Sequence, residues 1–266
     1  MHPAAMAALT VFLAGCLFYL GMILAAKLTS RPWRVLFLSV AVLFSLPAFF
    51  YIFYYTHLMD GAVWFYNLRI HSNTELLASG LGFLAGTVYA SRRPETLPQK
   101  ATIPLITLVA LMIPFLKPLL DPLNYAALSA NCAGEVCLQS TPSTCGPSSA
   151  ATILRLFGDN ASEKDLAQES FTSHGGTEIW YLARALQRRG YNTKVVAQPA
   201  TSPLPPLPAI AGVTLPGGVG HFLAVLSESN SQVTLADPLR GRFQVPSADL
   251  QRAYHFTGFY LAIRRR

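Results

Sequence analysis

A series of apolar runs in the first 120 residues most constrains how this chain can fold. A helix of about 20 apolar residues crosses the hydrocarbon core of a bilayer, which is ~30 Å thick. Few charges interrupt these runs, because residues 1–120 contain eight Lys or Arg and three Asp or Glu. We predict an all-α membrane domain over residues 1–120, with about four transmembrane helices at residues 4–26, 35–55, 75–90 and 102–120.

Two features of these apolar runs can each be interpreted in two ways. Residues 13–16 (Leu-Ala-Gly-Cys) have the form of a lipoprotein cleavage site, with Cys16 as the lipidated residue. No Lys or Arg precedes this site and the apolar run continues to residue 26, which favours a plain transmembrane helix. Gly82 and Gly86, four residues apart, indicate either a small-residue face against a neighbouring helix or a dimerisation site.

The segments around these runs predict their orientation. The aromatic residues at 64–66, between the second and third runs, are typical of a membrane–water interface. The loops after the first and third runs carry six basic residues, namely Lys27, Arg31, Arg34, Arg92, Arg93 and Lys100. The opposite side carries Arg69 and Lys117. Because basic loops stay in the cytoplasm, four spans place both termini outside, with the C-terminal part facing the periplasm or the cell exterior.

Residues 121–266 have the balance of a soluble domain, with twelve Lys or Arg and ten Asp or Glu. The whole chain has a formal charge of +7, but its basic residues form no single patch and several flank the apolar runs. We therefore expect no nucleic-acid partner and expect the lipid bilayer as one partner.

One stretch of this second half carries the chemistry. Cys145 precedes an apolar, helix-prone segment, and a helix N-terminus favours a thiolate, which is the nucleophilic form of cysteine. Gln139, six residues earlier, offers an amide that can donate to a developing oxyanion beside the Cys145 N–H. His221 and Asp237 follow in the order of a general base and the residue that orients it. Each residue alone has a structural explanation, but the four together indicate a catalytic centre.

With these motifs, the sequence resembles the C39-like cysteine peptidases over roughly residues 131–266. The resemblance rests on Gln139 with Cys145-Gly146-Pro147, on Gly220-His221-Phe222 leading a strand, and on Asp237-Pro238 with Gly241 shortly after. It implies a papain-like fold and a polypeptide substrate. Members of this family remove leader peptides after a double glycine, often while fused to an export ATPase. This chain has no G-x-x-x-x-G-K-[ST] phosphate loop, so any export machinery would be a separate partner.

The order of elements in the second half predicts an α+β domain. Helices are expected at about residues 146–157, from Ser162, and at 178–189 with Thr177 as its cap. Strands are expected at 194–198, 209–215, 221–227, 232–236, 242–245 and 256–263, with a short helix near 247–252. The proline-rich loop at 199–208 is a candidate for substrate selection.

Cys132 and Cys137, five residues apart just before Gln139, are spaced to close a small disulfide loop. A disulfide needs an oxidising compartment, which the predicted orientation supplies. Two free thiols remain an alternative, and a zinc site would need further ligands at suitable spacing. We expect no metal and no cofactor.

The sequence thus predicts a membrane-anchored cysteine peptidase acting on exported or membrane-associated polypeptides, with Cys145, His221, Asp237 and Gln139 as its site. A transamidase or acyltransferase would use the same Cys-His centre, because the acyl-enzyme needs only another acceptor. A membrane-tethered module that binds peptides without cutting them is a second alternative. A transporter is a third, although the spans hold no ionisable residue beyond Glu75 near one end.

Overall fold

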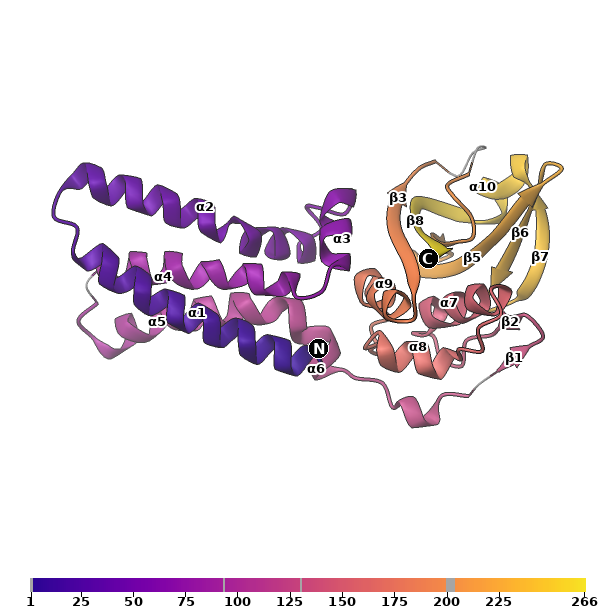
Figure 1. Cartoon of the computed structure of the whole chain (residues 1–266), viewed down its shortest axis with the longest axis horizontal. Helices are drawn as coiled ribbons and strands as arrows, with labels where there is room; N and C mark the ends of the chain where they lie inside the picture. The colour runs from indigo at the N-terminus through magenta and orange to yellow at the C-terminus, as the bar shows by residue number, and fades with distance from the viewer. Residues whose placement is uncertain (1, 93, 130, 200–203) are drawn as a thin grey trace. The chain divides into compact units, whose positions relative to one another are not determined.

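The computed structural model describes residues 2–92, 94–129, 131–199 and 204–266. The chain divides into two compact units, each of which is made of two segments that are separate in the sequence. The first, called here the helical unit, comprises Met1–Asp60 and Asn73–Leu120. The second, called here the sheet unit, comprises Gly61–Ser72 and Asp121–Arg266 (Figure 1).

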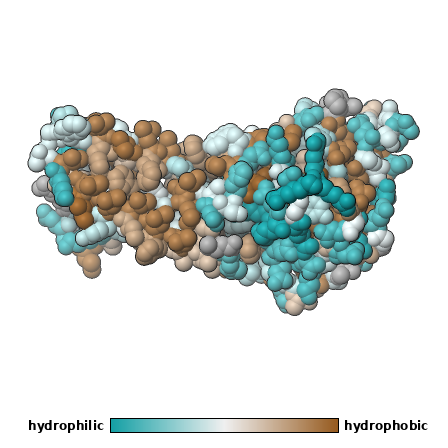
Figure 2. All heavy atoms as spheres, viewed as in Figure 1, coloured by the Kyte–Doolittle hydropathy of each residue, from teal (hydrophilic) through white to brown (hydrophobic). Residues whose placement is uncertain are grey.

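Consecutive helices make up the helical unit: α1 (Pro3–Ala26), α2 (Arg31–Tyr55), the 3₁₀ helix η1 (Thr74–Ser79), α4 (Gly80–Arg92), α5 (Leu97–Met112), the 3₁₀ helix η2 (Ile113–Phe115) and α6 (Leu116–Leu120). Three helical stretches are long and apolar enough to cross a membrane, namely Pro3–Ala26, Arg31–Tyr55 and Leu97–Leu120. Most of their surface is exposed in the structure, as expected of helices that face lipid. Brown, hydrophobic spheres accordingly predominate over this unit in Figure 2.

Two of the predicted spans are irregular. The run at 75–90 forms η1 followed by α4, a helix of 13 residues, and is not among the three long apolar stretches. That it crosses the membrane stays a prediction. The run at 102–120 is interrupted by the 3₁₀ turn Ile113–Phe115 around Pro114, which confirms that its prolines make it irregular.

Glycines of α4 fit against the backbone of α1. A Cβ atom added to Gly82 would lie 2.0 Å from the carbonyl oxygen of Ala14, and one added to Gly86 would lie 1.9 Å from that of Phe18. Atoms cannot approach this closely, so only glycine is accommodated at either position. Of the two interpretations of this pair, the structure shows the small-residue face, because α1 of the same chain occupies it.

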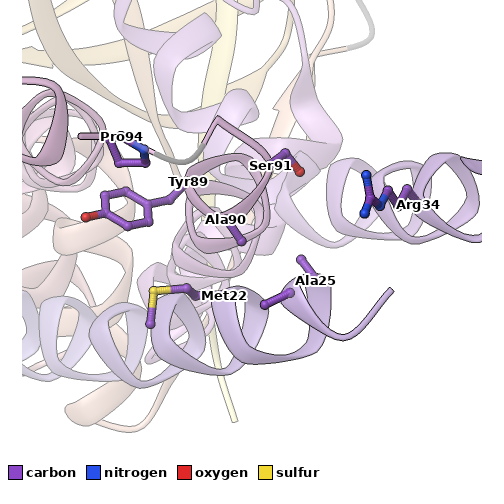
Figure 3. A pocket seen from close by; sticks show the side chains of 8 residues that line it. Met22, Ala25, Arg34, Tyr89, Ala90, Ser91 and Pro94 are labelled. Carbon is purple, nitrogen blue, oxygen red and sulfur yellow. The ribbon is translucent and has the colours of Figure 1, made fainter. Parts of the chain in front are cut away.

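The ends of the helical unit can be told apart by what packs there. At one end, Met6 and Ala7 of α1 pack with Phe115 of η2. At the other end, a cavity of about 410 Å³ lies where α1 and α4 end and α2 begins. Figure 3 shows Ala25, Arg34 and Ser91 around it. The loops after the first and third runs therefore meet at the same end, as an antiparallel arrangement of the four helices requires.

The sheet unit combines helices with an antiparallel sheet. Its helices are α3 (Val63–Ile70), α7 (Cys145–Leu156), α8 (Glu163–Glu169), α9 (Ile179–Arg188) and α10 (Leu250–Ala253). Its six-stranded sheet has the order β3 (Tyr191–Ala197), β8 (His255–Arg265), β4 (Ala209–Leu215), β5 (Val219–Ser229), β6 (Gln232–Asp237) and β7 (Gly241–Pro246). Figure 1 shows α7, α8 and α9 gathered beside the sheet, and the buried core includes apolar residues from β4, β5, β6 and β8.

The aromatic segment before the third run does not form the predicted interfacial belt. Residues 61–72 belong to the sheet unit, outside the boundary expected at residue 131, and form α3. Tyr66 contacts Phe259 of β8 with ring centroids 4.6 Å apart, and Asn67 hydrogen-bonds to β3. Phe65 is also buried, and only Trp64 remains exposed. A pattern of aromatic residues does not distinguish a membrane interface from a distant protein surface.

The other predicted elements of this unit lie close to their expected positions. The cap of α9 is Glu178 rather than Thr177, so that prediction was wrong. Ser162 caps α8 with a reciprocal capping box to Asp165, as the Ser-x-x-Asp spacing allows. Residues 200–203 of the candidate selection loop lie outside the described residues, as does Arg93 of the basic loop.

Candidate active site

Cys145 is the first residue of α7 and is 8% exposed. The first N–H groups of a helix have no partner within the helix and give this end a partial positive charge. The Cys145 side chain lies at this end of the helix, and its own N–H makes no hydrogen bond within the helix. The start of α7 supplies both a nucleophile and a donor for an oxyanion.

Two hydrogen bonds hold α7 in place. The hydroxyl of Ser149, four residues after Cys145, donates to the carbonyl oxygen of Phe222 at 3.1 Å. Thr152, almost one turn later, accepts from the N–H of Cys137 at 3.0 Å. Because Phe222 follows His221 directly, the first bond ties the cysteine helix to the histidine strand. Sequence reasoning missed Ser149, since a buried serine within a helix gives no signal of its partner.

The sheet register brings His221 and Asp237 together. Ala224 of β5 pairs with Ala236 of β6, which places Asp237 beside Leu223. Side chains alternate along a strand, so His221, two residues before Leu223, lies on the same face and diagonal to Asp237. The His221 Nε2 lies 2.8 Å from Oδ1 of Asp237, and both side chains are almost fully buried. The other ring nitrogen, Nδ1, is left to face Cys145.

The surroundings of His221 favour its charged form. Burial by itself lowers the pKa of His221, but hydrogen bonds with Asp237 and Cys145 and the charges of both groups raise that pKa to about 9. For Asp237, burial raises the carboxyl pKa, yet the hydrogen bonds it receives hold that pKa below its ordinary value. An ionised Asp237 beside a protonated His221 is therefore the stable arrangement near neutral pH.

Asp237 has two further partners that sequence reasoning did not find. The N–H of Leu239 donates to its Oδ1 at 2.9 Å, which is the Asx-type turn expected of an Asp-Pro sequence. The hydroxyl of Tyr254 donates to its other oxygen, Oδ2. No motif marks Tyr254, because it follows Asp237 by 17 residues and is aligned with it only by the fold.

Gln139 lies on the segment that leads into the cysteine helix. Its backbone N–H donates to the carbonyl oxygen of Pro238 at 3.0 Å, next to Asp237. Its side-chain Nε2 donates to the carbonyl oxygen of Thr141 at 2.8 Å. An amide nitrogen carries two hydrogens, so one remains for a substrate oxygen. The role of Gln139 as an oxyanion donor stays a prediction.

The segment around Gln139 is held from both sides. Glu163 of α8 is buried and accepts hydrogen bonds from the N–H and the hydroxyl of Ser140, at 2.8 and 2.9 Å. Cys132 and Cys137 form a disulfide that closes the hairpin β1 (Cys132–Ala133) to β2 (Val136–Cys137) just before it. The structure therefore shows neither free thiols nor a zinc site at these two cysteines. Both supports limit the motion of Gln139.

The structure brings Cys145, His221 and Asp237 into one buried cluster, while Gln139 is joined to it through the backbone of Pro238. This arrangement is suited to acyl transfer through a thioester, with a nucleophile, a proton-carrying imidazole and a carboxylate that orients it.

Comparison with solved structures finds similarity to peptidase domains. The peptidase domain of Streptococcus ComA, a bi-functional ABC transporter involved in a quorum-sensing pathway, aligns with 21% identity and a TM-score of 0.44. This alignment covers 50% of the present chain and 100% of that domain. A double glycine motif protease from an AMS/PCAT transporter, solved in complex with its leader peptide, aligns with 18% identity and a TM-score of 0.43, over 55% and 99% of the two chains.

Curated relatives align over about half of the chain. An uncharacterized protein from Methanothermobacter marburgensis is 32% identical over 127 residues, which is 48% of this chain and 86% of the relative. A second, from Methanothermobacter thermautotrophicus, is 32% identical over 130 residues, which is 49% of this chain and 88% of the relative. The model of the peptidase C39 family matches residues 134–266, half of the sequence. The chain therefore belongs to the peptidase C39 family.

Proposed function

We propose that this protein is a membrane-anchored cysteine peptidase that cleaves exported or membrane-associated polypeptides on the extracytoplasmic side of the membrane. The observation that carries the proposal is the buried cluster in which His221 bonds to Asp237 at 2.8 Å and faces Cys145 at the start of α7. Leader peptides of exported polypeptides are the first substrate class to test.

In the proposed mechanism the Cys145 thiolate attacks the carbonyl carbon of the scissile peptide bond. The carbonyl oxygen becomes an oxyanion, which the amide of Gln139 and the N–H of Cys145 stabilise. Protonated His221 gives its proton to the leaving amine as the C–N bond breaks, leaving a thioester on Cys145. Neutral His221 then takes a proton from water, which attacks the thioester and releases the acid. Asp237 keeps the imidazole oriented throughout.

The composition of the sheet unit supports the proposed location. Residues 61–72, between α2 and η1, pack with residues 121–266, so both segments lie on the same side of the membrane. The chain must therefore cross an even number of times between residues 72 and 121. If the apolar stretch Leu97–Leu120 crosses, the stretch Thr74–Arg92 must cross as well.

The length of this stretch is sufficient for a crossing. A 3₁₀ helix rises ~2.0 Å per residue and an α-helix ~1.5 Å. With six residues in η1 and 13 in α4, Thr74–Arg92 spans about 31 Å by these rises, close to the ~30 Å thickness of the hydrocarbon core. The 3₁₀ turns thus lengthen a segment that would be short as a pure α-helix.

The distribution of charge supports the extracytoplasmic location of the sheet unit. Arg69, counted in the sequence among the charges opposite the basic loops, is fully buried in the sheet unit over the Trp180 ring. Even with Arg69 counted, the loops after the first and third runs carry six basic residues against two on the opposite side, which favours these loops in the cytoplasm. The Cys132–Cys137 disulfide is also compatible with an oxidising, extracytoplasmic compartment.

The test of cleavage uses intact cells. We would compare the N-termini of membrane and exported polypeptides in cells that produce the unchanged protein or Cys145→Ala. We expect a set of N-termini that is absent with Cys145→Ala. With Gln139→Ala these N-termini should form about 10²–10³-fold more slowly. Termini that persist with Cys145→Ala would contradict the peptidase function and favour a peptide-binding module. A free carboxylate on the partner fragment indicates hydrolysis, whereas a new amide indicates transfer to another acceptor.

The test of location uses single cysteines in a background of Cys16→Ser and Cys145→Ser, in which the two remaining native cysteines form the disulfide. Ser129 and Thr29 are both exposed in the structure, so a cysteine at either position is accessible from its own side of the membrane. A membrane-impermeant maleimide should therefore label Ser129→Cys in intact cells but not Thr29→Cys. Labelling of Thr29→Cys instead of Ser129→Cys would place the sheet unit in the cytoplasm.

A further inference from the structure

The Asp237 carboxylate accepts hydrogen bonds at both of its oxygens. Oδ1 receives His221 and the N–H of Leu239, at 2.8 and 2.9 Å. Oδ2 receives the hydroxyl of Tyr254. A carboxylate held at one oxygen can still turn about its Cβ–Cγ bond, whereas one held at both oxygens has a fixed plane. The bond from Tyr254 is the one that removes this freedom.

Tyr254 is itself held firmly. It precedes β8 and is 5% exposed. Its ring packs near those of Phe243 and Phe256, with centroids 6.2 and 6.4 Å away, and the Arg240 guanidinium lies 5.7 Å from its centroid. Its backbone N–H donates to the carbonyl oxygen of Leu250 at 3.1 Å. The hydroxyl therefore points at Asp237 from a rigid support.

The charge state of Tyr254 is suited to this contact. Burial raises the pKa of its hydroxyl, and the hydrogen bond to ionised Asp237 raises that pKa further. The hydroxyl is therefore held as a neutral donor at neutral pH. A donor to an ionised acceptor forms a stronger hydrogen bond than one between neutral groups.

We propose that Tyr254 is a positioning residue of the catalytic centre, whose hydroxyl fixes the Asp237 carboxylate so that Oδ1 stays on Nε2 of His221. This inference rests on the proposed function. Tyr254 acts through Asp237 and does not touch the reacting atoms, so removing its hydroxyl should change His221 only while the carboxylate is present.

The test measures the charge of His221 in the full chain carrying Cys16→Ser. An imidazolium attracts iodoacetate, which is an anion, but not iodoacetamide, which is neutral. The rate of Cys145 alkylation by iodoacetate, divided by the rate with iodoacetamide, therefore falls as His221 loses its proton. We expect the midpoint of this fall at about pH 9. In Tyr254→Phe the ring and its packing remain, and we expect the midpoint to fall by about one pH unit, within the strength of a charged hydrogen bond.

The matched control is Tyr260→Phe. Tyr260 lies on β8 and is fully buried, and no partner for its hydroxyl is found in the described part of the chain. Its removal should leave the midpoint unchanged. The decisive comparison is made in Asp237→Asn, where we expect Tyr254→Phe to cause no further shift, because the carboxylate that it positions is gone.

Three outcomes overturn the inference, two of them on their own and one together with the proposed function. If Tyr254→Phe leaves the midpoint unchanged, or shifts it equally with Asp237 and with Asp237→Asn, then Tyr254 only packs in the core. If Cys145 is equally reactive in the unchanged protein and in His221→Ala, the proposed function itself fails, and the inference fails with it. The His221→Ala comparison distinguishes these two failures.

Discussion

Asn67 provides the most direct test of how the sheet unit is assembled, because it joins α3 to the sheet. Its Oδ1 accepts from the N–H of Val195 at 2.9 Å, and its Nδ2 donates to the carbonyl oxygen of the same residue at 2.9 Å. β3 is an edge strand, whose outward N–H and C=O groups have no neighbouring strand. One side chain of α3 thus satisfies both free groups of a residue that is fully buried.

The expected cost follows from these two bonds. Each net hydrogen bond contributes ~0.5–1.5 kcal/mol, and each buried group left without a partner costs ~1–3 kcal/mol. Asn67→Ala should therefore lower the free energy of unfolding of the sheet unit by about 2–4 kcal/mol. For a domain of about 150 residues, this corresponds to a fall of about 10 °C in Tm. Asn67→Asp should cost at least as much, since it places a carboxylate against the Val195 carbonyl.

The assay is thermal unfolding of the full chain in lipid nanodiscs, followed by near-UV circular dichroism. Asn192→Ala is the matched control, since Asn192 lies on β3 but is exposed. If Asn67→Ala unfolds at the same temperature as Asn192→Ala, then α3 does not support the sheet in the way described, and residues 61–72 would belong with the membrane helices after all.

Three further changes test other parts of the structure. Gly86→Leu should prevent α4 from packing on α1 and reduce the yield of folded protein in membranes, whereas Gly15→Leu, at a position where an added Cβ meets nothing within 4 Å, should be tolerated. Breaking the Cys132–Cys137 disulfide by reduction should destabilise the hairpin by about 2 kcal/mol, as expected for a loop of this length, and intact proteolytic resistance around Gln139 after reduction would argue against that support. Because the pKa of His221 rises from 6.5 to about 9 on folding, its protonation contributes stability that is complete below pH 6.5 and is lost as the pH rises through 9. The free energy of unfolding should fall by on the order of 3 kcal/mol over that window, and His221→Gln should abolish the fall.

Local pattern predicted most of the elements of the sheet unit. The strand at 209–215 and the capping serine of α8 are observed where the alternation of residues and the Ser-x-x-Asp spacing place them. The order Cys145, His221, Asp237 was also sufficient to predict which side chains meet. The strand and the cap depend on residues that are close in sequence. The catalytic residues depend on a motif that, taken together, indicates one kind of site.

Contacts that depend on distant parts of the chain could not be predicted in this way. Tyr254 reaches Asp237, and Ser149 reaches the Phe222 carbonyl, only because the sheet and α7 are already folded. The membership of α3 in the sheet unit is a stronger case. Its aromatic residues suit a membrane interface equally well, and only its partners on α9, β3 and β8 identify the surface that it covers.

The most direct test of the central claim is the rate of iodoacetamide alkylation of Cys145 against pH, in the full chain carrying Cys16→Ser, with and without His221→Ala. With the disulfide intact, Cys145 is then the one reactive thiol. We predict fast alkylation well below pH ~8.5, the ordinary pKa of a free thiol, and its loss in His221→Ala. Slow alkylation that follows an ordinary thiol and does not change with His221→Ala, in a protein shown to be folded, would contradict the catalytic pair and with it the peptidase function.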